Sequence, residues 1–320
     1  MHEALAPAFH ELIDVDAPVE EIGSGFHFTE GPAWDVVEGE LLFSDIPDSI
    51  VRAWHPERGI RTWREPSEMA NGLAFDREGR LLACEAATSR VTRTDRDGSI
   101  EVVASHWQGK ELNSPNDVVV RSDGSIWFTD PPSGRSRPHG VPRPRQIDVQ
   151  GVFRVPPGGG EPDLVVDDFA IPNGLCFSPD ESTLYVNDSI RRHVRAFAVR
   201  DDGSLAGGEV VSSQGPPIED VQELVDSLVE RGELPYGIPD GMKCDERGTI
   251  WCTGLGGIWL VSPAGEHLGT VRLPAIPSNL AWGEPDDRTL FVTTPRAVYR
   301  LRTRVAGAPL PAFTRTGDPR

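Results

Sequence analysis

The stretch Asn71-Gly-Leu-Ala-Phe75, followed after a turn by Leu81-Leu-Ala-Cys-Glu85, decides the fold because the chain repeats this pattern six times. Both halves are rich in strand-forming residues, and Gly79 between them is typical of a hairpin turn. The first halves of the six copies are Glu30-Gly-Pro-Ala-Trp34, Asn71-Gly-Leu-Ala-Phe75, Asn116-Asp-Val-Val-Val120, Asn173-Gly-Leu-Cys-Phe177, Asp240-Gly-Met-Lys-Cys244 and Ser278-Asn-Leu-Ala-Trp282. Each copy is therefore expected to open with a β-hairpin.

The spacing of the copies indicates the architecture. Their first residues lie 41, 45, 57, 67 and 38 residues apart, the first value being 71 minus 30. The short intervals match a four-stranded blade, and the long ones leave room for insertions. The sequence therefore predicts an all-β fold, a six-bladed β-propeller.

The ends of the chain suggest how the propeller closes. The sixth copy lacks an obvious outer strand, whereas Val19-Glu-Glu-Ile22 looks like a strand without a blade. We predict that this N-terminal strand joins the last blade, where it would cover an exposed sheet edge. Because each blade can bury its faces only against its neighbours, we expect a single domain over residues 17–305. Residues 1–16 and 306–320 are expected to be peripheral tails.

Composition excludes several classes of function. Lys and Arg number 31 against 50 Asp and Glu, and the resulting net charge of −19 argues against a nucleic-acid partner. No stretch is apolar enough for a membrane span, and the acidic N-terminus lacks the pattern of a signal peptide, so we expect a cytosolic protein without a membrane partner. A monomer and a homodimer both remain open. The four cysteines show no C-x-x-C spacing and are expected to be buried thiols: Cys84, Cys176, Cys244 and Cys252.

The first position of the repeat carries an oxygen-bearing side chain in every copy: Glu30, Asn71, Asn116, Asn173, Asp240 and Ser278. The innermost strands of a propeller line one channel, so these side chains are expected to converge on the axis. The two carboxylates and the amides of Asn116 and Asn173 form a hard, all-oxygen donor set. Such a set suits one divalent cation, with Ca²⁺ as the first expectation and Mg²⁺, Mn²⁺ or Zn²⁺ as alternatives. The competing interpretation is that these residues cap their own turns or line a wet channel.

Several stretches resemble, in order, motifs of the gluconolactonase and senescence-marker-protein (regucalcin-like) family, which includes the luciferin-regenerating enzyme. They are Phe28-Thr-Glu-Gly-Pro-Ala-Trp34, Asn113-Ser-Pro-Asn-Asp117, Phe128-Thr-Asp-Pro-Pro132, Ile171-Pro-Asn-Gly-Leu175 and Pro239-Asp-Gly-Met-Lys243. The resemblance implies a six-bladed propeller with one catalytic divalent cation, usually calcium, at the channel mouth. It assigns the metal ligands to Glu30, Asn116, Asn173 and Asp240, which the repeat also selects.

The resemblance further implies a metal-dependent hydrolase of lactones, in which the cation polarises the lactone carbonyl and stabilises the oxyanion. Asp240 is the candidate general base for the attacking water. A hydroxide bound to the cation is the alternative base, because a carboxylate bound to a dication has a lowered pKa. Two other interpretations remain: the same site acting on another electrophile, such as a phosphotriester or in a non-hydrolytic biosynthetic step, and a non-enzymatic propeller that binds metal or protein.

The substrate is expected to be a sugar lactone or another small lactone, and four residues are candidates for binding it. Regucalcin-like members carry an Arg where this chain has Ser114, which argues against sugar-acid recognition of the regucalcin type. Asn71 is assigned to substrate or to a water beside the metal, with turn capping as the alternative. Arg135 and His139 belong to an insertion, residues 131–150, that also contains Arg137, Arg143 and Arg145. This insertion is expected either to bind an anionic group of the substrate or to be a solvated loop.

A second insertion, Ile218 to Leu234, has apolar residues at helical spacing and is predicted to be an amphipathic helix. It ends just before Asp240. It is expected to serve as a lid over the channel mouth or as an oligomer contact.

Overall fold

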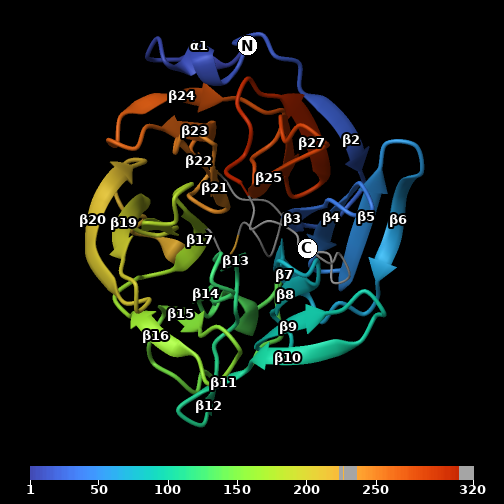
Figure 1. Ribbon diagram of the computed structural model, residues 1–320, viewed down its shortest axis with the longest axis vertical. Helices are drawn as coiled ribbons and strands as arrows, with labels where there is room; N and C mark the ends of the chain where they lie inside the picture. Colours follow the sequence, from blue (N-terminus) through green and yellow to red (C-terminus); the bar gives the residue numbers. More distant parts are fainter. Residues whose placement is uncertain (223–225, 227–235, 310–320) are drawn as a thin grey trace, which may run out of the picture.

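Each predicted hairpin forms the two innermost strands of a blade in the computed structural model, which describes residues 1–222, 226 and 236–309 (Figure 1). From the axis outward, blade one contains β3 (Thr29–Asp35), β4 (Glu40–Asp45), β5 (Ile50–His55) and β6 (Gly59–Arg64), and blade two contains β7 (Ala70–Phe75), β8 (Leu81–Glu85), β9 (Arg90–Thr94) and β10 (Ile100–Ala104). Blade three contains β13 (Val118–Val120), β14 (Ile126–Asp130), β15 (Gly151–Val155) and β16 (Asp163–Val166).

The second half of the ring follows the same order. Blade four contains β17 (Pro172–Phe177), β18 (Thr183–Asp188), β19 (His193–Val199) and β20 (Leu205–Ser213), and blade five contains β21 (Met242–Cys244), β22 (Ile250–Gly254), β23 (Gly257–Val261) and β24 (His267–Val271). Blade six contains β25 (Asn279–Gly283), β26 (Thr289–Thr293) and β27 (Ala297–Arg302). The prediction of an all-β, six-bladed propeller is confirmed.

The propeller closes as predicted, with an N-terminal strand on the last blade. β2 (Glu20–Ser24) pairs antiparallel with β27, and Glu20 lies opposite Arg300. The pair also carries a salt bridge from Arg300 Nε to Glu20 Oε2 at 2.8 Å. The edge of blade six is therefore covered by a strand from the other end of the chain.

Residues 1–16, which were expected to be a peripheral tail, lie outside the ring of blades but are packed there (Figure 1). β1 (Glu3–Ala4) adds a fifth strand to blade five by pairing with β24. The short helix α1 (Phe9–Leu12) buries Phe9 completely against the apolar cluster of blades five and six. Gly269 makes this approach feasible, because a Cβ atom there would stand 2.3 Å from the Glu3 carbonyl oxygen.

Aromatic pairs between neighbouring blades form much of the core. Trp34 stacks on Phe291 between blades one and six, with ring centroids 5.4 Å apart. Trp251 meets Trp282 edge-on between blades five and six at 5.2 Å. This is the packing that a blade needs, because one sheet alone leaves both faces exposed.

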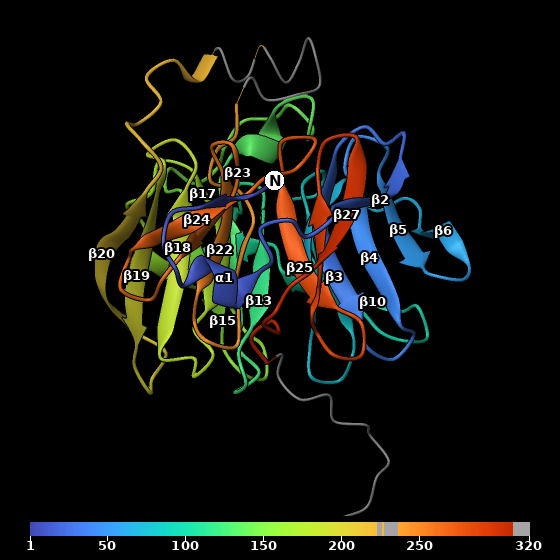
Figure 2. The ribbon, with the colours of Figure 1, turned by 90° about the horizontal axis from the view of Figure 1, so that it is seen from above.

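The described parts of the two insertions lie on the face of the propeller where the innermost strands begin (Figure 2). Residues 131–150 connect β14 to β15 and contain the short 3₁₀ helix η1 (Ser133–Arg135), and a small hairpin of β11 (His106–Trp107) and β12 (Lys110–Glu111) precedes blade three. The helix predicted over Ile218 to Leu234 falls largely outside the described residues. In the described part of the chain, no helix has the length and apolar character needed to cross a membrane.

Candidate metal centre at the channel mouth

The glycines after the first repeat position bring neighbouring innermost strands together. A Cβ atom on Gly31 would lie 2.1 Å from the Asn71 carbonyl oxygen, and one on Gly174 would lie 2.1 Å from that of Asp240. The Gly174 amide instead donates to the Asp240 carbonyl at 3.1 Å. These Glu-Gly, Asn-Gly and Asp-Gly pairs therefore reflect close contact between blades. The contact places the first repeat positions of adjacent blades next to one another.

The second innermost strand fixes the same positions from the side. In blades one, three, four and five, the fourth residue of the second-strand repeat donates to the carbonyl oxygen of the first repeat position in the next blade. These bonds are Ser44 to Asn71 at 2.8 Å, Thr129 to Asn173 at 2.8 Å, Asn187 to Asp240 at 2.6 Å and Thr253 to Ser278 at 3.4 Å. The polar residue at this place in the repeat thus serves to hold the backbone of the ring.

All four residues expected to bind the metal are nearly buried in this ring. Glu30 is 4% exposed, and Asn116, Asn173 and Asp240 are each 9% exposed. Glu30 and Asn173 are the second residues of β3 and β17, whereas Asn116 and Asp240 stand two residues before β13 and β21. The four side chains thus come from blades one, three, four and five at the same level of the channel.

Among the described residues, no cationic side chain donates a hydrogen bond to the carboxylate of Glu30 or Asp240. Glu30 Oε2 accepts from the Gly31 amide at 2.7 Å and from Asn279 Nδ2 at 2.9 Å, which are both neutral donors. Burial raises the pKa of Glu30 to about 7. Burial, and then the charge of Glu30, raise the pKa of Asp240 well above its usual value, although a hydrogen bond from Asn173 opposes the shift. Such a pair is stabilised by protons or by a bound cation.

The donor set fits a hard divalent cation. Carboxylate and amide oxygens are the ligands preferred by Ca²⁺, and a dication would supply the charge that the buried carboxylates lack. Asn173 Nδ2 donates to Ser189 Oγ at 3.0 Å, which fixes the orientation of its amide group. The Ser189 hydroxyl in turn donates to the Pro239 carbonyl at 2.6 Å, directly before Asp240.

Ser114 and Arg135, expected to contact substrate, are engaged within the protein. Ser114 is buried, and its hydroxyl donates to the Pro131 carbonyl at 2.7 Å and accepts from the Gly134 amide at 2.9 Å. Arg135 is also buried and donates to the Asn113 carbonyl at 2.7 Å and to Glu111 Oε2 at 2.8 Å. Both side chains anchor the insertion to blade three, and these contacts do not support a substrate role.

Asn71 and His139 are placed differently. Asn71 is half-buried in the ring, and its Oδ1 has no hydrogen-bond partner among the described residues. The ring of His139 lies 4.1 Å from that of Phe28, two residues before Glu30. Burial lowers the pKa of His139 to about 4, so its imidazole is neutral near pH 7.

Sequence reasoning missed two polar residues at the second repeat position, where four copies have glycine. Asn279 donates to Glu30, as described above, and Asp117, which directly follows Asn116, is 2% exposed. Their departure from glycine at this position of the six copies was the available signal. A separate grouping of His27, Asp45 and Asp48 differs from the predicted ligand set. Its carboxylates already pair with Arg52, at 2.9 Å for Asp45 and 3.4 Å for Asp48.

The fold and this ring define a class of propeller with an oxygen-donor centre at one mouth of the axial channel. Residues 28–296 match the family model described as the SMP-30/Gluconolactonase/LRE-like region, and the chain belongs to this family. The gluconolactonase of Zymomonas mobilis is 32% identical, over 94% of this chain and 86% of its own length. The pentonolactonase XacC of Haloferax volcanii is 28% identical, over 83% of this chain and 80% of its own length.

A solved structure of a gluconolactonase from Xanthomonas campestris superimposes with a TM-score of 0.82 at 31% identity, covering 94% of both chains. The resemblance drawn from the sequence motifs is therefore confirmed.

Proposed function

We propose that the protein is a divalent-cation-dependent lactonase that opens a sugar lactone or another small lactone. The observation that carries this proposal is the convergence of two buried carboxylates, Glu30 and Asp240, while none of the six described ring positions carries a cationic side chain. Burying two carboxylates together is energetically unfavourable, and a non-enzymatic scaffold does not require it. A metal-dependent hydrolase requires such carboxylates to bind its cation. The names of the similar gluconolactonase and pentonolactonase support lactones as the substrate class.

Glu30, Asn116, Asn173 and Asp240 would hold the cation, with Ca²⁺ as the ion that best suits their oxygens. When bound, it would supply Lewis-acid polarisation of the lactone carbonyl. Asp240 is proposed to accept the proton of the attacking water, since its carboxylate lies in the ring and Asn173 orients it. The Ser189 hydroxyl accepts a hydrogen bond from the Asn173 amide and donates one to the Pro239 carbonyl. It thereby fixes the position of two groups next to Asp240.

Asn71 and His139 are proposed to contact the substrate. Asn71 is half-buried in the ring, and its side-chain amide can exchange a hydrogen bond with a hydroxyl group of a lactone. The neutral His139 imidazole can donate or accept without adding charge beside the metal ligands. Its packing on Phe28 links the 131–150 insertion to the strand that carries Glu30.

The test is hydrolysis of a panel of aldonolactones, simple γ- and δ-lactones and phosphotriesters, followed by pH-stat titration. We expect turnover of at least one lactone, loss of activity after EDTA treatment, and recovery with Ca²⁺ or Mn²⁺. Full activity after exhaustive chelation would refute the metal dependence. Turnover of phosphotriesters alone would replace the lactonase assignment.

A further inference from the structure

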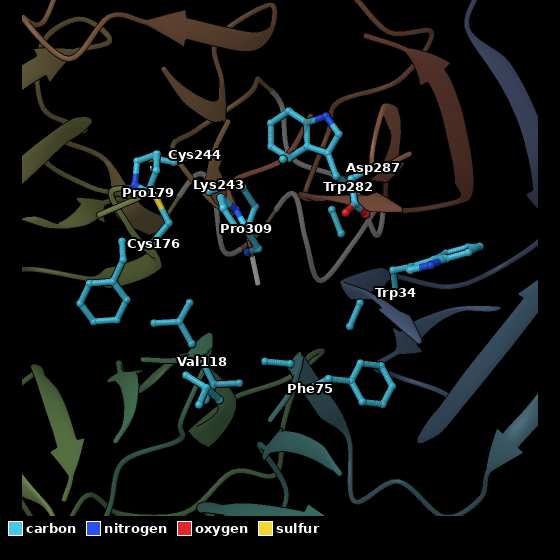
Figure 3. A pocket seen from close by; sticks show the side chains of 18 of the residues that line it. Trp34, Phe75, Val118, Cys176, Pro179, Lys243, Cys244, Trp282, Asp287 and Pro309 are labelled. Carbon is cyan, nitrogen blue, oxygen red and sulfur yellow. Dashed lines mark hydrogen bonds between the residues drawn. The ribbon is translucent and has the colours of Figure 1, made fainter. Parts of the chain in front are cut away.

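The fourth repeat position lies one level deeper in the channel than the metal ring. Its six residues are Ala33, Ala74, Val119, Cys176, Lys243 and Ala281, and all line a cavity on the axis. The surrounding walls are largely apolar, with Trp34, Phe75 and Trp282 among them (Figure 3). Among the described residues that line this cavity, Lys243 is the one basic side chain. The small side chains at the equivalent positions leave space for it.

Lys243 pairs with Asp117 across the channel. Its Nζ lies 3.7 Å from Asp117 Oδ2, and both side chains belong to the innermost layer, one in blade five and the other beside blade three. Asp117 Oδ1 accepts from the Val118 amide at 3.0 Å, whereas Oδ2 has no hydrogen bond from the described residues. The Lys243 ammonium is therefore the countercharge of a buried carboxylate that would otherwise be unpaired.

The same pair lies beside the metal ring. Asp117 directly follows Asn116 in the chain, and Lys243 stands three residues after Asp240, so both charges are close to proposed metal ligands. When Glu30, Asp117 and Asp240 are all ionised, their three negative charges and the one positive charge of Lys243 sum to −2. One divalent cation neutralises this group, as a water-poor site requires.

We propose that Lys243 is a positioning residue that sets the charge of the metal centre, so that the ring matches a divalent ion. Because Lys243 pairs with Asp117, the positive charge of Lys243 offsets the negative charge of that carboxylate. The cation then meets only the charges of Glu30 and Asp240. The inference rests on the proposed function, because it assumes that the ring binds a cation.

The test compares Ca²⁺ and Tb³⁺ binding by titration calorimetry in the wild type, Lys243→Met, Asp117→Asn and the double variant. Met keeps the length of the side chain and removes its charge. We expect Lys243→Met to bind Ca²⁺ about tenfold more tightly and Tb³⁺ about thirtyfold more tightly, since Coulomb energy scales with ionic charge. Asp117→Asn should bind both ions about tenfold or more weakly. The double variant should return close to the wild type.

The matched control is Lys110→Met, on the exposed β12 strand, which should bind both ions as the wild type does. If the wild type binds Ca²⁺ but both single variants keep its affinity, or shift it in the same direction, Lys243 does not set the charge. If the wild type binds neither ion, the metal centre itself fails and this inference fails with it. Should Lys243→Met not fold, Lys243→Gln, which also removes the charge, replaces it in the same comparison with Asp117→Asn and the double variant.

Discussion

At the scale of single residues, the repeat predicts which side chains enter the channel but not what each one does there. Glu30, Asn116, Asn173 and Asp240 could be selected because one position per copy carries oxygen donors. Ser114 and Arg135 could not be interpreted in the same way. Their hydrogen bonds go to backbone carbonyls of the insertion and its neighbours, which only the folded loop brings within reach.

Asp240→Asn should leave the fold intact and reduce turnover by several orders of magnitude. The substitution removes charge from the metal ring and the proposed base together, while Asn has nearly the same volume. Lactone hydrolysis and circular dichroism measure the two effects. Asp286→Asn, at an exposed loop, is the matched control and should retain wild-type turnover. An Asp240→Asn enzyme with near-normal turnover would assign the base elsewhere.

The raised pKa of Glu30 predicts that the stabilisation of the protein by Ca²⁺ depends on pH. Its pKa is raised from 4.5 to about 7, so the metal-free native state holds a proton that the unfolded state releases. Between these values, stability of the metal-free protein therefore falls as pH rises, whereas Ca²⁺ binding strengthens as Glu30 loses its proton. The Ca²⁺-induced rise in Tm should grow from about pH 5 to about pH 8.

Glu30→Gln serves to check this assignment, because Gln cannot titrate. The variant should show a smaller Ca²⁺-induced rise in Tm with a flatter dependence on pH. A wild-type response to Ca²⁺ that is the same at both ends of the range would contradict the prediction.

At the scale of secondary-structure elements, the hairpins were predictable and the insertions were not. A hairpin is encoded locally by alternating apolar residues and a glycine turn, and the six copies reinforce one another. The 131–150 insertion has no such periodicity. From the sequence, its arginines could either bind an anionic group of the substrate or be solvated, but Arg135 and Arg143 donate mainly to groups of the protein itself.

Arg135→Met should destabilise the protein by about 1–3 kcal/mol, because it removes the hydrogen bonds from a buried guanidinium to the Asn113 carbonyl and to Glu111. Arg137→Met lies in the same insertion at an exposed position and should change stability by less than about 0.5 kcal/mol. Urea unfolding of both variants gives the comparison. Equal stabilities would show that Arg135 does not anchor the loop.

At the scale of the whole molecule, the number of blades and the closure by β2 follow from counting strands, because the sixth copy supplies three strands and β2 provides the fourth. The packing of residues 1–16 could not be predicted by counting strands. Phe9 has no periodic pattern around it, and its burial depends on contacts with β24, which is distant in the sequence.

Phe9→Ala should reduce the free energy of unfolding by about 3–5 kcal/mol, the usual cost of emptying a fully buried phenylalanine site. Leu5→Ala is the control in the same segment, since Leu5 is 57% exposed, and it should cost less than about 0.5 kcal/mol. Chemical denaturation measures both. A Phe9→Ala protein as stable as the wild type would show that the packing of residues 1–16 against blade five contributes little to the free energy of unfolding.

The pairing of β2 with β27 also has a consequence for how the protein is made. The strands that complete blade six include Glu20 and Arg300, which are 280 residues apart in the chain. During synthesis, five blades can emerge and pack in order, but the seam stays open until the last strand leaves the ribosome. Until then, β2 is a strand without a partner and the Trp34 face of blade one lacks Phe291. The nascent chain therefore presents its open seam for almost the whole of translation, and that is the interval in which a chaperone would protect it.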